Sequence, residues 1–336
     1  MRITKLGRTG LKVSEICLGT MTFGNQADAQ TAYEIMDVAL GAGVNFFDTA
    51  DVYPLGGDLD SVGATEEIIG LWMLDRRCRD DIVLATKCRG RMGRRANDEG
   101  LSRKHILAAC EASLRRLRTE YTDLYQVHAP DPDTPIEETL RALDDLVRSG
   151  KVRYIGCSNF PAWQLADALW TSDRHGLARF DCDQPRYNLL FRMIEAEILP
   201  LCRAHGVGVI AYNPLAGGML TGRYRETRSV QEGTRFALEN SGPMYQKRYW
   251  RDPVFEAVNR LADQLEGRGQ SLTHVALAWV LTQPGVTSAI LGASRPEQLR
   301  DSLGGVGLEL DPEVLAACDE VWYELPRERD PEIAQR

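Results

Sequence analysis

The stretch VNFFDTADVY, residues 44–53, begins as an apolar run and then places an acid, Asp48, five residues before a phenol, Tyr53. A strand end that needed only a turn would use Gly, Asn or Ser. Two later apolar runs also end on chemically active side chains, because DIVLATK ends on Lys87 and TDLYQVH ends on His128. The arrangement of these runs therefore decides both the fold and the site.

Eight apolar runs follow one another along the chain, and each is followed by a helical pattern or a loop. They are EICLGTM (15–21), VNFFD (44–48), DIVLATK (81–87), TDLYQVH (122–128), KVRYIGCSN (151–159), FDCDQP (180–185), GVGVIAY (206–212) and SAILG (288–292). Eight β/α units in about 300 residues favour a closed barrel over an open sheet. The sequence predicts an α/β fold, a (β/α)8 TIM barrel with an N-terminal β-hairpin over residues 3–13 and a C-terminal helical extension over 312–323.

An open doubly wound sheet was the main alternative, because GVGVIA at 206–211 has the form GxGxxA. That fingerprint binds a dinucleotide only where it follows a strand and opens a helix. Here it follows a helix and lies within the strand itself. The chain offers no other stretch of this form, so we expect no Rossmann domain.

Sequence signals also place helix ends and one long irregular segment. A helix is expected to open at Ser102, and another to be capped by Thr134, with Pro135 first and Glu137 completing a capping box. The stretch 221–250 is rich in Arg, Gly and Glu and is expected to be a long loop. Loops of that length in compact domains are usually functional.

Composition excludes several classes of function. The chain has 336 residues, 43% of them hydrophobic, and a net charge of −8 without a basic block, so nucleic acid is not an expected partner. No apolar stretch reaches the roughly 18 residues of a membrane span, and no signal peptide is visible. Eight scattered cysteines without CxxC spacing predict buried thiols in a cytoplasmic protein with no metal site. We expect residues 1–336 to form one domain.

In a barrel of this kind, the carboxyl ends of the strands converge on one site. Asp48, Lys87 and His128 end the second, third and fourth runs, and Tyr53 follows the second. Each residue alone has an ordinary explanation, such as a turn cap, a loop anchor, a surface ion pair or a hydrogen-bonded histidine. Together at consecutive strand ends, they predict one acid–base site.

The chemistry of these four residues favours carbonyl reduction. A lysine ammonium beside Tyr53 would lower the tyrosine pKa from its usual value near 10, and Asp48 would keep Lys87 charged. Tyr53 would then act as the general acid and base, and His128 would orient a carbonyl oxygen. The set contains no electron source, so a cofactor must supply the reducing equivalent.

The remaining strand ends suit a nicotinamide cofactor. Ser158, Asn159 and Gln184 offer groups that match a carboxamide, and Tyr212 offers an aromatic face. Ser294 and Glu297 are expected to form a capping box at a helix N-terminus that can bind an anion. Phosphate contacts, or alternatively solvated surface charges, are expected at Arg223, Arg235 and Arg295.

The motifs of this chain resemble those of the aldo-keto reductase family, in order and over almost the whole length. They are FFDTADVY, LATK, YQVH, IGCSNF, YNPLAGGMLTGRY and LGASRPEQL. Two further stretches, HAPDPDTPIEETLRAL and TEEIIG, are similar to the bacterial subgroup that includes the β-subunits of voltage-gated potassium channels.

The resemblance implies a barrel that binds extended NADPH and reduces an aldehyde or ketone. It implies Tyr53 as proton donor, Lys87 and Asp48 as its support, and His128 as the carbonyl orienter. The long loop 221–250 would then lie over the cofactor. The implied cofactor contacts, by segment, are Gly19, Thr20, Met21, Gln26 and Asp48; Ser158, Asn159, Gln184 and Tyr212; Asn213, Pro214, Leu215, Gly217, Leu220, Arg223 and Arg235; and Gly292, Ser294, Gln298, Asp301 and Ser302. Asn213 and Ser302 depart from the family pattern, which usually has Ser and Asn there.

Three functions fit these observations to different degrees. The first is an NADPH-dependent reductase of a small carbonyl compound. The second is an NADPH-binding regulatory or redox-sensing subunit with little turnover; channel subunits of the family lack a histidine at the position of His128. The third keeps the barrel but uses Lys87 as a Schiff-base amine, which an Asp-paired, charged lysine does poorly.

Substrate specificity is expected to come from three variable segments. They are PLGGDLDSVGA (54–64), the 89–100 loop and the C-terminal segment 323–336. Arg91, Arg94 and Arg95 in the second segment would favour an acidic or phosphorylated substrate, or are simply solvated charges. The sequence leaves the substrate itself open.

Overall fold

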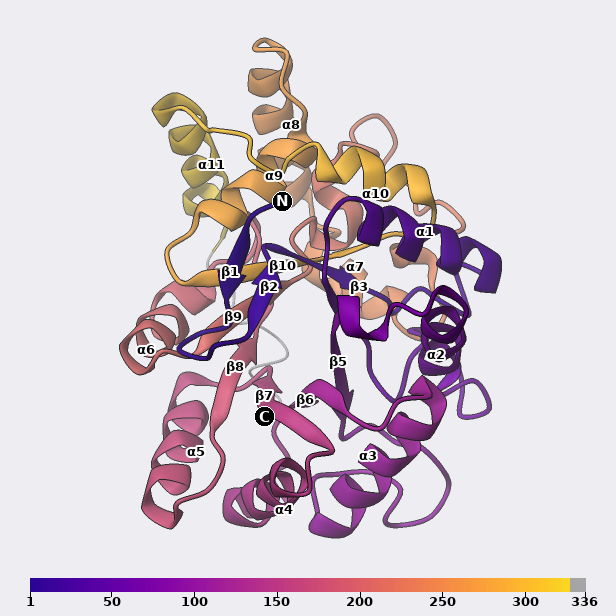
Figure 1. Ribbon diagram of the computed structural model, residues 1–336. Coiled ribbons are helices and arrows are strands. Elements are labelled where there is room, and N and C mark those ends of the chain that lie inside the picture. The colour runs from indigo at the N-terminus through magenta and orange to yellow at the C-terminus, as the bar shows by residue number, and fades with distance from the viewer. Residues whose placement is uncertain (327–336) are drawn as a thin grey trace.

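A computed structural model describes residues 1–326 and shows a closed barrel of eight parallel strands surrounded by helices (Figure 1). The strands pair in the order β10-β3-β4-β5-β6-β7-β8-β9, so the first and last members of the barrel are neighbours. Their bounds are β3 Ile16–Gly19, β4 Phe46–Asp48, β5 Val83–Cys88, β6 Thr122–Val127, β7 Val152–Ser158, β8 Phe180–Gln184, β9 Gly208–Tyr212 and β10 Val286–Gly292. The predicted TIM barrel is confirmed.

A short antiparallel hairpin precedes the barrel, as predicted. It pairs β1 Ile3–Lys5 with β2 Lys12–Ser14. The Arg8 N–H donates to Gly206 O at 2.8 Å, just before β9 begins. Leu6 and Val13 pack into the same buried cluster as side chains from inside the barrel. The hairpin thus closes the end of the barrel at which the strands begin, which leaves the opposite end for a site.

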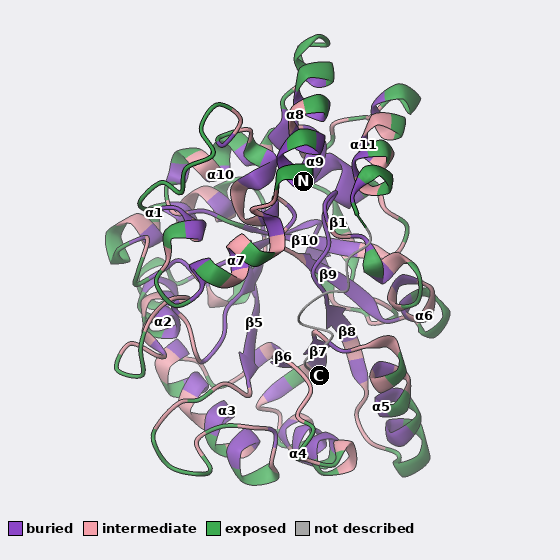
Figure 2. Ribbon diagram, turned by 180° about the vertical axis from the view of Figure 1, so that it is seen from behind, coloured by how far each residue is buried: buried purple, intermediate pink, exposed green. Residues whose placement is uncertain are grey.

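Two buried apolar clusters hold the fold together. A small one fills the barrel interior and includes Cys17, Phe46, Leu124 and Ile210. A much larger one lies between the strands and the surrounding helices, where each helix turns its apolar side inward, as Figure 2 shows by burial. Side chains that alternate along each strand therefore face one cluster or the other.

Helices follow the strands in the predicted rhythm. Their bounds are α1 Ala29–Gly41, α2 Ala64–Arg76, α3 Arg103–Leu117, α4 Ile136–Arg148, α5 Ala162–His175, α6 Ile198–His205, α7 Gly242–Tyr249, α8 Asp252–Glu266, α9 Leu272–Thr282, α10 Pro296–Leu303 and α11 Pro312–Glu324. The Ser102 side chain caps α3 by accepting from His105 N, as expected. Helix α11 is the expected C-terminal extension.

The capping box predicted at the start of α4 is wrong. Thr134 donates its hydroxyl proton to Asp131 instead of capping the helix, and Pro135 occupies the N-cap position without a side-chain bond. Glu137 pairs along the helix with Arg141. The Thr134 hydroxyl bonds to the Asp131 carboxylate in the loop before the helix. The capping-box pattern alone therefore does not determine the partner of this hydroxyl.

The capping box predicted at Ser294 and Glu297 is also wrong. Arg295 is the N-cap residue of α10, and no side chain caps that helix. Ser294 bonds instead to Gln298, whose Oε1 accepts from the Ser294 N–H at 2.9 Å and from its hydroxyl at 3.1 Å. The partner lies one residue further along the helix than the pattern predicts.

The segment 221–250 is only partly a loop. Its first part is irregular, a short 3-10 turn spans Arg235–Ala237, and α7 occupies the end of the segment. The loop expectation was therefore wrong for α7, which Figure 2 shows on the side of the barrel opposite the hairpin.

The predicted burial of the cysteines is found in the structure. All eight cysteines are buried and none forms a disulfide. Within residues 1–326, no group of His, Cys, Asp and Glu side chains is arranged to hold a metal ion. No helix in that range is long and apolar enough to cross a membrane. Part of the C-terminal segment considered for specificity, residues 327–336, lies outside the described residues.

Candidate functional site

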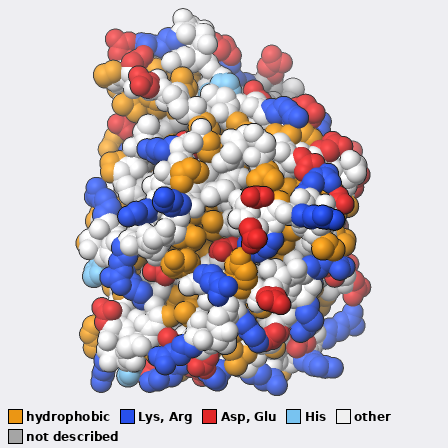
Figure 3. Space-filling model, in the orientation of Figure 1, with side chains coloured by type: hydrophobic (Ala, Val, Ile, Leu, Met, Phe, Trp, Pro, Cys, Tyr) orange, Lys and Arg blue, Asp and Glu red, His pale blue; other side chains and the backbone are white. Residues whose placement is uncertain are grey.

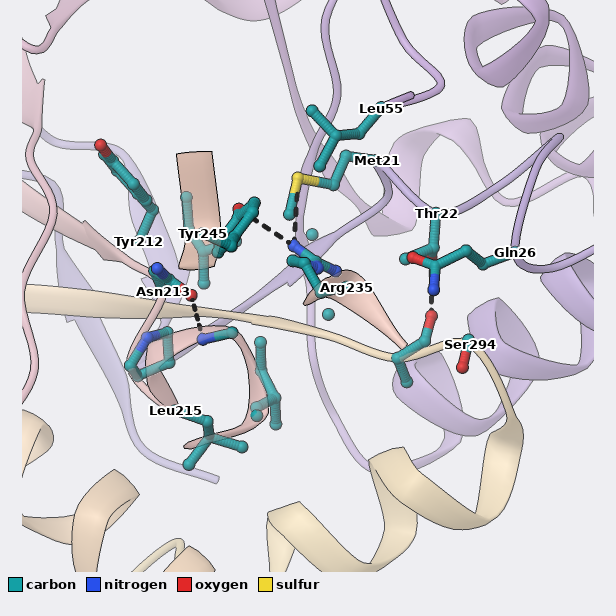
Figure 4. A pocket seen from close by; sticks show the side chains of 18 of the residues that line it. Met21, Thr22, Gln26, Leu55, Tyr212, Asn213, Leu215, Arg235, Tyr245 and Ser294 are labelled. Atoms are coloured by element: carbon teal, nitrogen blue, oxygen red, sulfur yellow. Dashed lines mark hydrogen bonds between the residues drawn. The ribbon is translucent and has the colours of Figure 1, made fainter. Parts of the chain in front are cut away.

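A cavity of about 630 Å³ lies at the ends of the strands away from the hairpin. Its volume is within the roughly 300–1,000 Å³ typical of sites for small molecules and cofactors. It extends from Tyr53 and His128 to Asp301 and Ser302 on α10, so its walls come from both halves of the chain. Figure 4 shows part of the lining.

Asp48 and Lys87 form a buried ion pair under this cavity. Lys87 Nζ lies 2.5 Å from Asp48 Oδ2 and also donates to Thr49 O at 2.7 Å. The Lys87 side chain has no exposed surface. Burial acts to lower the pKa of Lys87, but Asp48 and Tyr53 outweigh it and raise the pKa above the usual value for lysine. The lysine is therefore held in its charged form.

Two glutamines complete the surroundings of Asp48. Gln126 Nε2 and Gln184 Nε2 donate to Asp48 Oδ1 at 3.0 and 2.9 Å, and Gln184 Nε2 also reaches Gln126 Oε1 at 3.1 Å. A Cβ on Gly156 of β7 would collide first with Cys182 Sγ and would also lie 3.3 Å from Gln126 Cγ, so glycine leaves room for both side chains. Asp48 thus accepts bonds from three side chains, which fixes its orientation.

Gln126 was missed in the sequence, although a signal existed. It stands two residues after Leu124, a residue of the barrel interior, so strand periodicity turns both side chains inward. A fully buried amide at an inward position near a strand end is a polar group that needs a partner. That partner is Asp48.

Tyr53 and His128 lie together above the ion pair. Lys87 Nζ is 5.1 Å from the centre of the Tyr53 ring, and the rings of Tyr53 and His128 meet edge to face with their centres 5.9 Å apart. The two aromatic groups therefore border the same part of the cavity, with the lysine ammonium beneath them.

The pKa of Tyr53 differs from the sequence expectation. Removal from water raises it above 10, and this outweighs the opposing effect of Lys87. Tyr53 therefore holds its proton at neutral pH. Burial, followed by Lys87 and Arg89, lowers the pKa of His128 to about 3, so this imidazole is neutral. A protonated phenol and a neutral imidazole can both donate a hydrogen bond to a carbonyl oxygen.

The predicted carboxamide-binding residues form one hydrogen-bonded group. Ser158 donates its hydroxyl proton to Gln184 O at 2.7 Å. The Asn159 amide nitrogen donates to Ser158 Oγ and to His128 O, both at 2.9 Å. Tyr212 donates its hydroxyl proton to Asn159 Oδ1 at 2.9 Å. These bonds join the ends of β7, β8 and β9 to the residue that follows β6.

Asn213 has a local structural role that a serine would not fill in the same way. Its φ of +64° lies in the left-handed region, which asparagine tolerates better than most residues. Its Oδ1 accepts from Gly217 N at 2.7 Å, and its Nδ2 donates to Tyr249 OH at 3.0 Å. The side chain thereby ties the turn after β9 to α7.

Most predicted cofactor residues line the cavity. Those that do, within the described chain, are Gly19, Thr20, Met21, Gln26, Asp48, Ser158, Asn159, Gln184, Tyr212, Asn213, Pro214, Leu215, Gly217, Arg223, Arg235, Gly292, Ser294, Gln298, Asp301 and Ser302. Leu220 is fully buried behind the cavity wall, and Lys87 is fully buried beneath the cavity. Arg295 is exposed and is not a lining residue among those described.

Three contacts hold the 221–250 segment across the cavity. Gln26 Nε2 donates to Gly233 O at 2.9 Å, and Arg235 Nη1 lies 3.5 Å from Met21 Sδ. Asn240 Nδ2 donates to Gly56 O at 3.2 Å, in the loop after β4. The segment therefore joins the loop after β3 to the loop that carries Tyr53.

Lining residues of α7 were missed because the segment was expected to be a loop. They are Met244, Tyr245 and Arg248. Tyr245 and Tyr249 are both buried and stand four residues apart, which is the spacing of one helix face. The spacing of these two aromatic residues was the signal in the sequence that could have predicted the helix.

Known proteins resemble this chain over almost its whole length. A family model described as "Aldo/keto reductase family" matches residues 15–323. The chain is 40% identical over 328 residues to the "Uncharacterized oxidoreductase YrpG" of Bacillus subtilis, with 96% of each chain covered. It is 38% identical to the "Probable voltage-gated potassium channel subunit beta" of Arabidopsis thaliana, covering 97% of this chain and 98% of that one. It is also 35% identical to "Aldo-keto reductase YhdN" of Bacillus subtilis, covering 89% and 87%.

Proposed function

Because the chain belongs to the aldo/keto reductase family of oxidoreductases, we propose that it reduces an aldehyde or ketone to an alcohol with NADPH, and that Tyr53 is the proton donor. Members of this family typically use NAD(P)H and act on small carbonyl compounds. The observation that carries the proposal is the Asp48–Lys87 ion pair beneath Tyr53, with His128 beside the phenol.

The cavity is suited to an extended dinucleotide. Its catalytic end is lined by Tyr53 and His128, and its far end by Asp301 and Ser302. The lining residues Arg223, Arg235 and Arg248 provide positive charge for phosphates. Near the catalytic end, Ser158, Asn159 and Gln184 offer polar groups for a carboxamide, and Tyr212 offers a ring.

When bound, NADPH would supply a hydride to the carbonyl carbon of the substrate and become NADP⁺. Tyr53 would give its hydroxyl proton to the carbonyl oxygen, which becomes the alcohol oxygen. His128 would donate an N–H to the same oxygen and hold it near Tyr53. Lys87 would stabilise the phenolate that remains on Tyr53, and Asp48 would keep the lysine in place.

Two other functions receive less support. The similarity to a protein named as a potassium channel β-subunit favours a regulatory role, but a neutral imidazole and a protonated phenol at one cavity favour turnover. Schiff-base chemistry needs a neutral lysine. Asp48 raises the pKa of Lys87, and Lys87 Nζ donates hydrogen bonds to Asp48 Oδ2 and Thr49 O.

The test compares the wild type with Tyr53→Phe. NADPH oxidation is followed at its absorbance band with a panel of aldehydes and ketones, and the Kd for NADPH is measured by fluorescence. We expect turnover by the wild type and a loss of at least about a hundredfold in the variant, with NADPH affinity nearly unchanged. Tight NADPH binding without turnover by the wild type would instead favour the regulatory subunit.

A further inference from the structure

Gln126 is a buried polar side chain to which the proposed reaction assigns no role. It lies on β6, has no exposed surface, and is not among the cavity-lining residues of the described chain. Its side chain nevertheless reaches the floor of the site, where Gln126 Nε2 donates to Asp48 Oδ1 at 3.0 Å. Gln126 can therefore act on a ligand in the cavity only through the residues to which it bonds.

The bonds among Asp48, Gln126 and Gln184 determine which way both amide groups face. Asp48 is paired with the Lys87 ammonium, and a carboxylate offers only acceptor atoms. Its Oδ1 therefore takes one N–H from Gln126 at 3.0 Å and another from Gln184 at 2.9 Å. With its nitrogen turned to Asp48, Gln126 presents its Oε1 to Gln184, whose Nε2 donates to it at 3.1 Å. One carboxylate thus fixes the orientation of both amides.

This arrangement leaves Gln184 with a single kind of free group. An amide nitrogen carries two protons, and Asp48 and Gln126 accept one each from Gln184 Nε2. Gln184 is only 3% exposed and yet lines the cavity. The side-chain atom that remains for a ligand is therefore Gln184 Oε1, which can only accept a hydrogen bond.

Both glutamines are closely confined. A Cβ on Gly156 would collide with Cys182 Sγ and would also lie 3.3 Å from Gln126 Cγ, so that the Gln126 side chain has little space on this side. Cys182 Sγ lies 3.9 Å from Gln126 Oε1. The Ser158 hydroxyl donates to Gln184 O at 2.7 Å and holds the backbone there. The two amides are therefore kept in register with each other.

From these contacts we propose that Gln126 is a positioning residue: by accepting one amide proton of Gln184, it makes Gln184 a pure acceptor for the carboxamide of the nicotinamide. The inference rests on the proposed function, because it needs a nicotinamide cofactor at this end of the cavity. The carboxamide N–H₂ group would donate to Gln184 Oε1. A cofactor without that N–H₂ group leaves a buried oxygen without a partner, which weakens its binding.

The test compares NADP⁺ with its 3-acetylpyridine analogue, in which a methyl group replaces the carboxamide N–H₂. Gln126→Met keeps a side chain of similar length but removes the amide. We expect the wild type to bind NADP⁺ about tenfold more tightly than the analogue, and the variant only about twofold more tightly. The preference falls because the freed proton of Gln184 can be donated to the oxygen that both ligands carry. Fluorescence titration measures each Kd without any turnover.

Thr122→Val is the matched control. Thr122 is a buried polar residue at the start of the same strand, and its hydroxyl donates to Leu84 O at 2.8 Å. We expect this variant to be less stable than the wild type but to keep the tenfold preference. A general loss of packing raises both Kd values equally and cancels in their ratio, so an unchanged ratio in Gln126→Met would overturn the inference.

A second variant keeps the test decisive if Gln126→Met does not fold. Gln126→Asn retains an amide, but its shorter side chain cannot reach Asp48 and Gln184 together, so the same fall in preference is expected. Equal affinity of the wild type for the two ligands would also overturn the inference. The proposed function fails separately, if the wild type shows no saturable binding of NADP⁺ or NADPH; binding with an unchanged ratio in the variants removes only the role of Gln126.

Discussion

At Asp48, one carboxylate organises three side chains of the site. One oxygen accepts from Lys87 and the other from both Gln126 and Gln184. An asparagine would keep an acceptor oxygen for one neighbour but would present an N–H₂ group to another donor. It would also leave the buried Lys87 ammonium without its counter-charge. The geometry of Lys87 and its protonation therefore depend on the same residue.

We expect Asp48→Asn to reduce kcat by about 100- to 1,000-fold while the NADPH Kd changes by no more than roughly threefold. Loss of one partner of a buried pair should also lower the free energy of unfolding by about 3–5 kcal/mol. Steady-state kinetics, NADPH titration and urea unfolding would measure these effects. Asp60→Asn, an exposed carboxylate in the loop after β4, is the control. Loss of cofactor binding equal to the loss of kcat would contradict the role given to Asp48.

The pH dependence of the reaction follows from His128 and Tyr53. Since the pKa of His128 is about 3, the folded protein protonates this imidazole only in strong acid. Since the pKa of Tyr53 is raised above 10, its proton is retained well above neutrality. We therefore expect kcat/KM for reduction to show no histidine ionisation between about pH 5 and 9. A pH–rate profile with an inflection near the ordinary histidine pKa of about 6.5 would contradict this result.

At the scale of elements, the strands and their ends were predictable, whereas helix α7 was not. Apolar runs of five to nine residues indicate where each strand ends, because the chain must leave the core there. Asp48, Ser158, Gln184 and Tyr212 are the last residues of their strands, as expected. Lys87 is the last residue but one of β5, and His128 follows β6 directly.

Helix α7 escaped prediction because its pattern is short and mostly polar. Two buried tyrosines, Tyr245 and Tyr249, carry its inward face, and Gly and Pro stand at its start. Its position is fixed by distant contacts, such as Asn213 with Tyr249 and Gln246 with Phe236 O. Contacts of this kind cannot be read from local sequence. The capping boxes at Thr134 and Ser294 failed for a different reason, since Asp131 and Gln298, which lie close by in the sequence, accept from the hydroxyl groups instead.

Arg235 gives a prediction for the 221–250 segment. It lines the cavity and contacts Met21 and Tyr245 from a segment that crosses the site. We expect Arg235→Ala to raise the Kd of NADPH by about tenfold and that of NADH by much less, because a guanidinium pairs with the additional phosphate. Fluorescence titration with both cofactors measures the ratio. If the ratio stays at the wild-type value, Arg235 does not recognise the 2′-phosphate.

At the scale of the whole molecule, an acidic protein has a cavity lined by positive charge. The net charge is −8, and Figure 3 shows Lys and Arg interspersed with Asp and Glu over one face. The charged lining residues are Arg223, Arg235, Arg248, Asp48 and Asp301. Lys87 neutralises Asp48, so the three arginines outweigh the one remaining carboxylate. A local excess of positive charge in the cavity of a negative molecule attracts anions to the site.

We therefore expect NADPH binding to weaken as salt is added. Between roughly 0.05 and 0.5 M NaCl, the Kd should rise severalfold, because ions screen the attraction between the phosphates and the arginines. Arg223→Gln should flatten this dependence, since it removes one of the charges. Titrations at several ionic strengths make the measurement. A Kd that does not change with salt would show that the arginines contribute little to affinity.

The burial of all eight cysteines makes the folded protein a convenient starting material for spectroscopy. Burial raises the pKa of thiols throughout the chain, for example that of Cys110 to about 12, so few are ionised at neutral pH. A single cysteine introduced at the exposed Lys247 of α7 would then be the preferred site for a maleimide dye. Such a dye would report how α7 moves when cofactor and substrate bind, without any native cysteine having to be removed first.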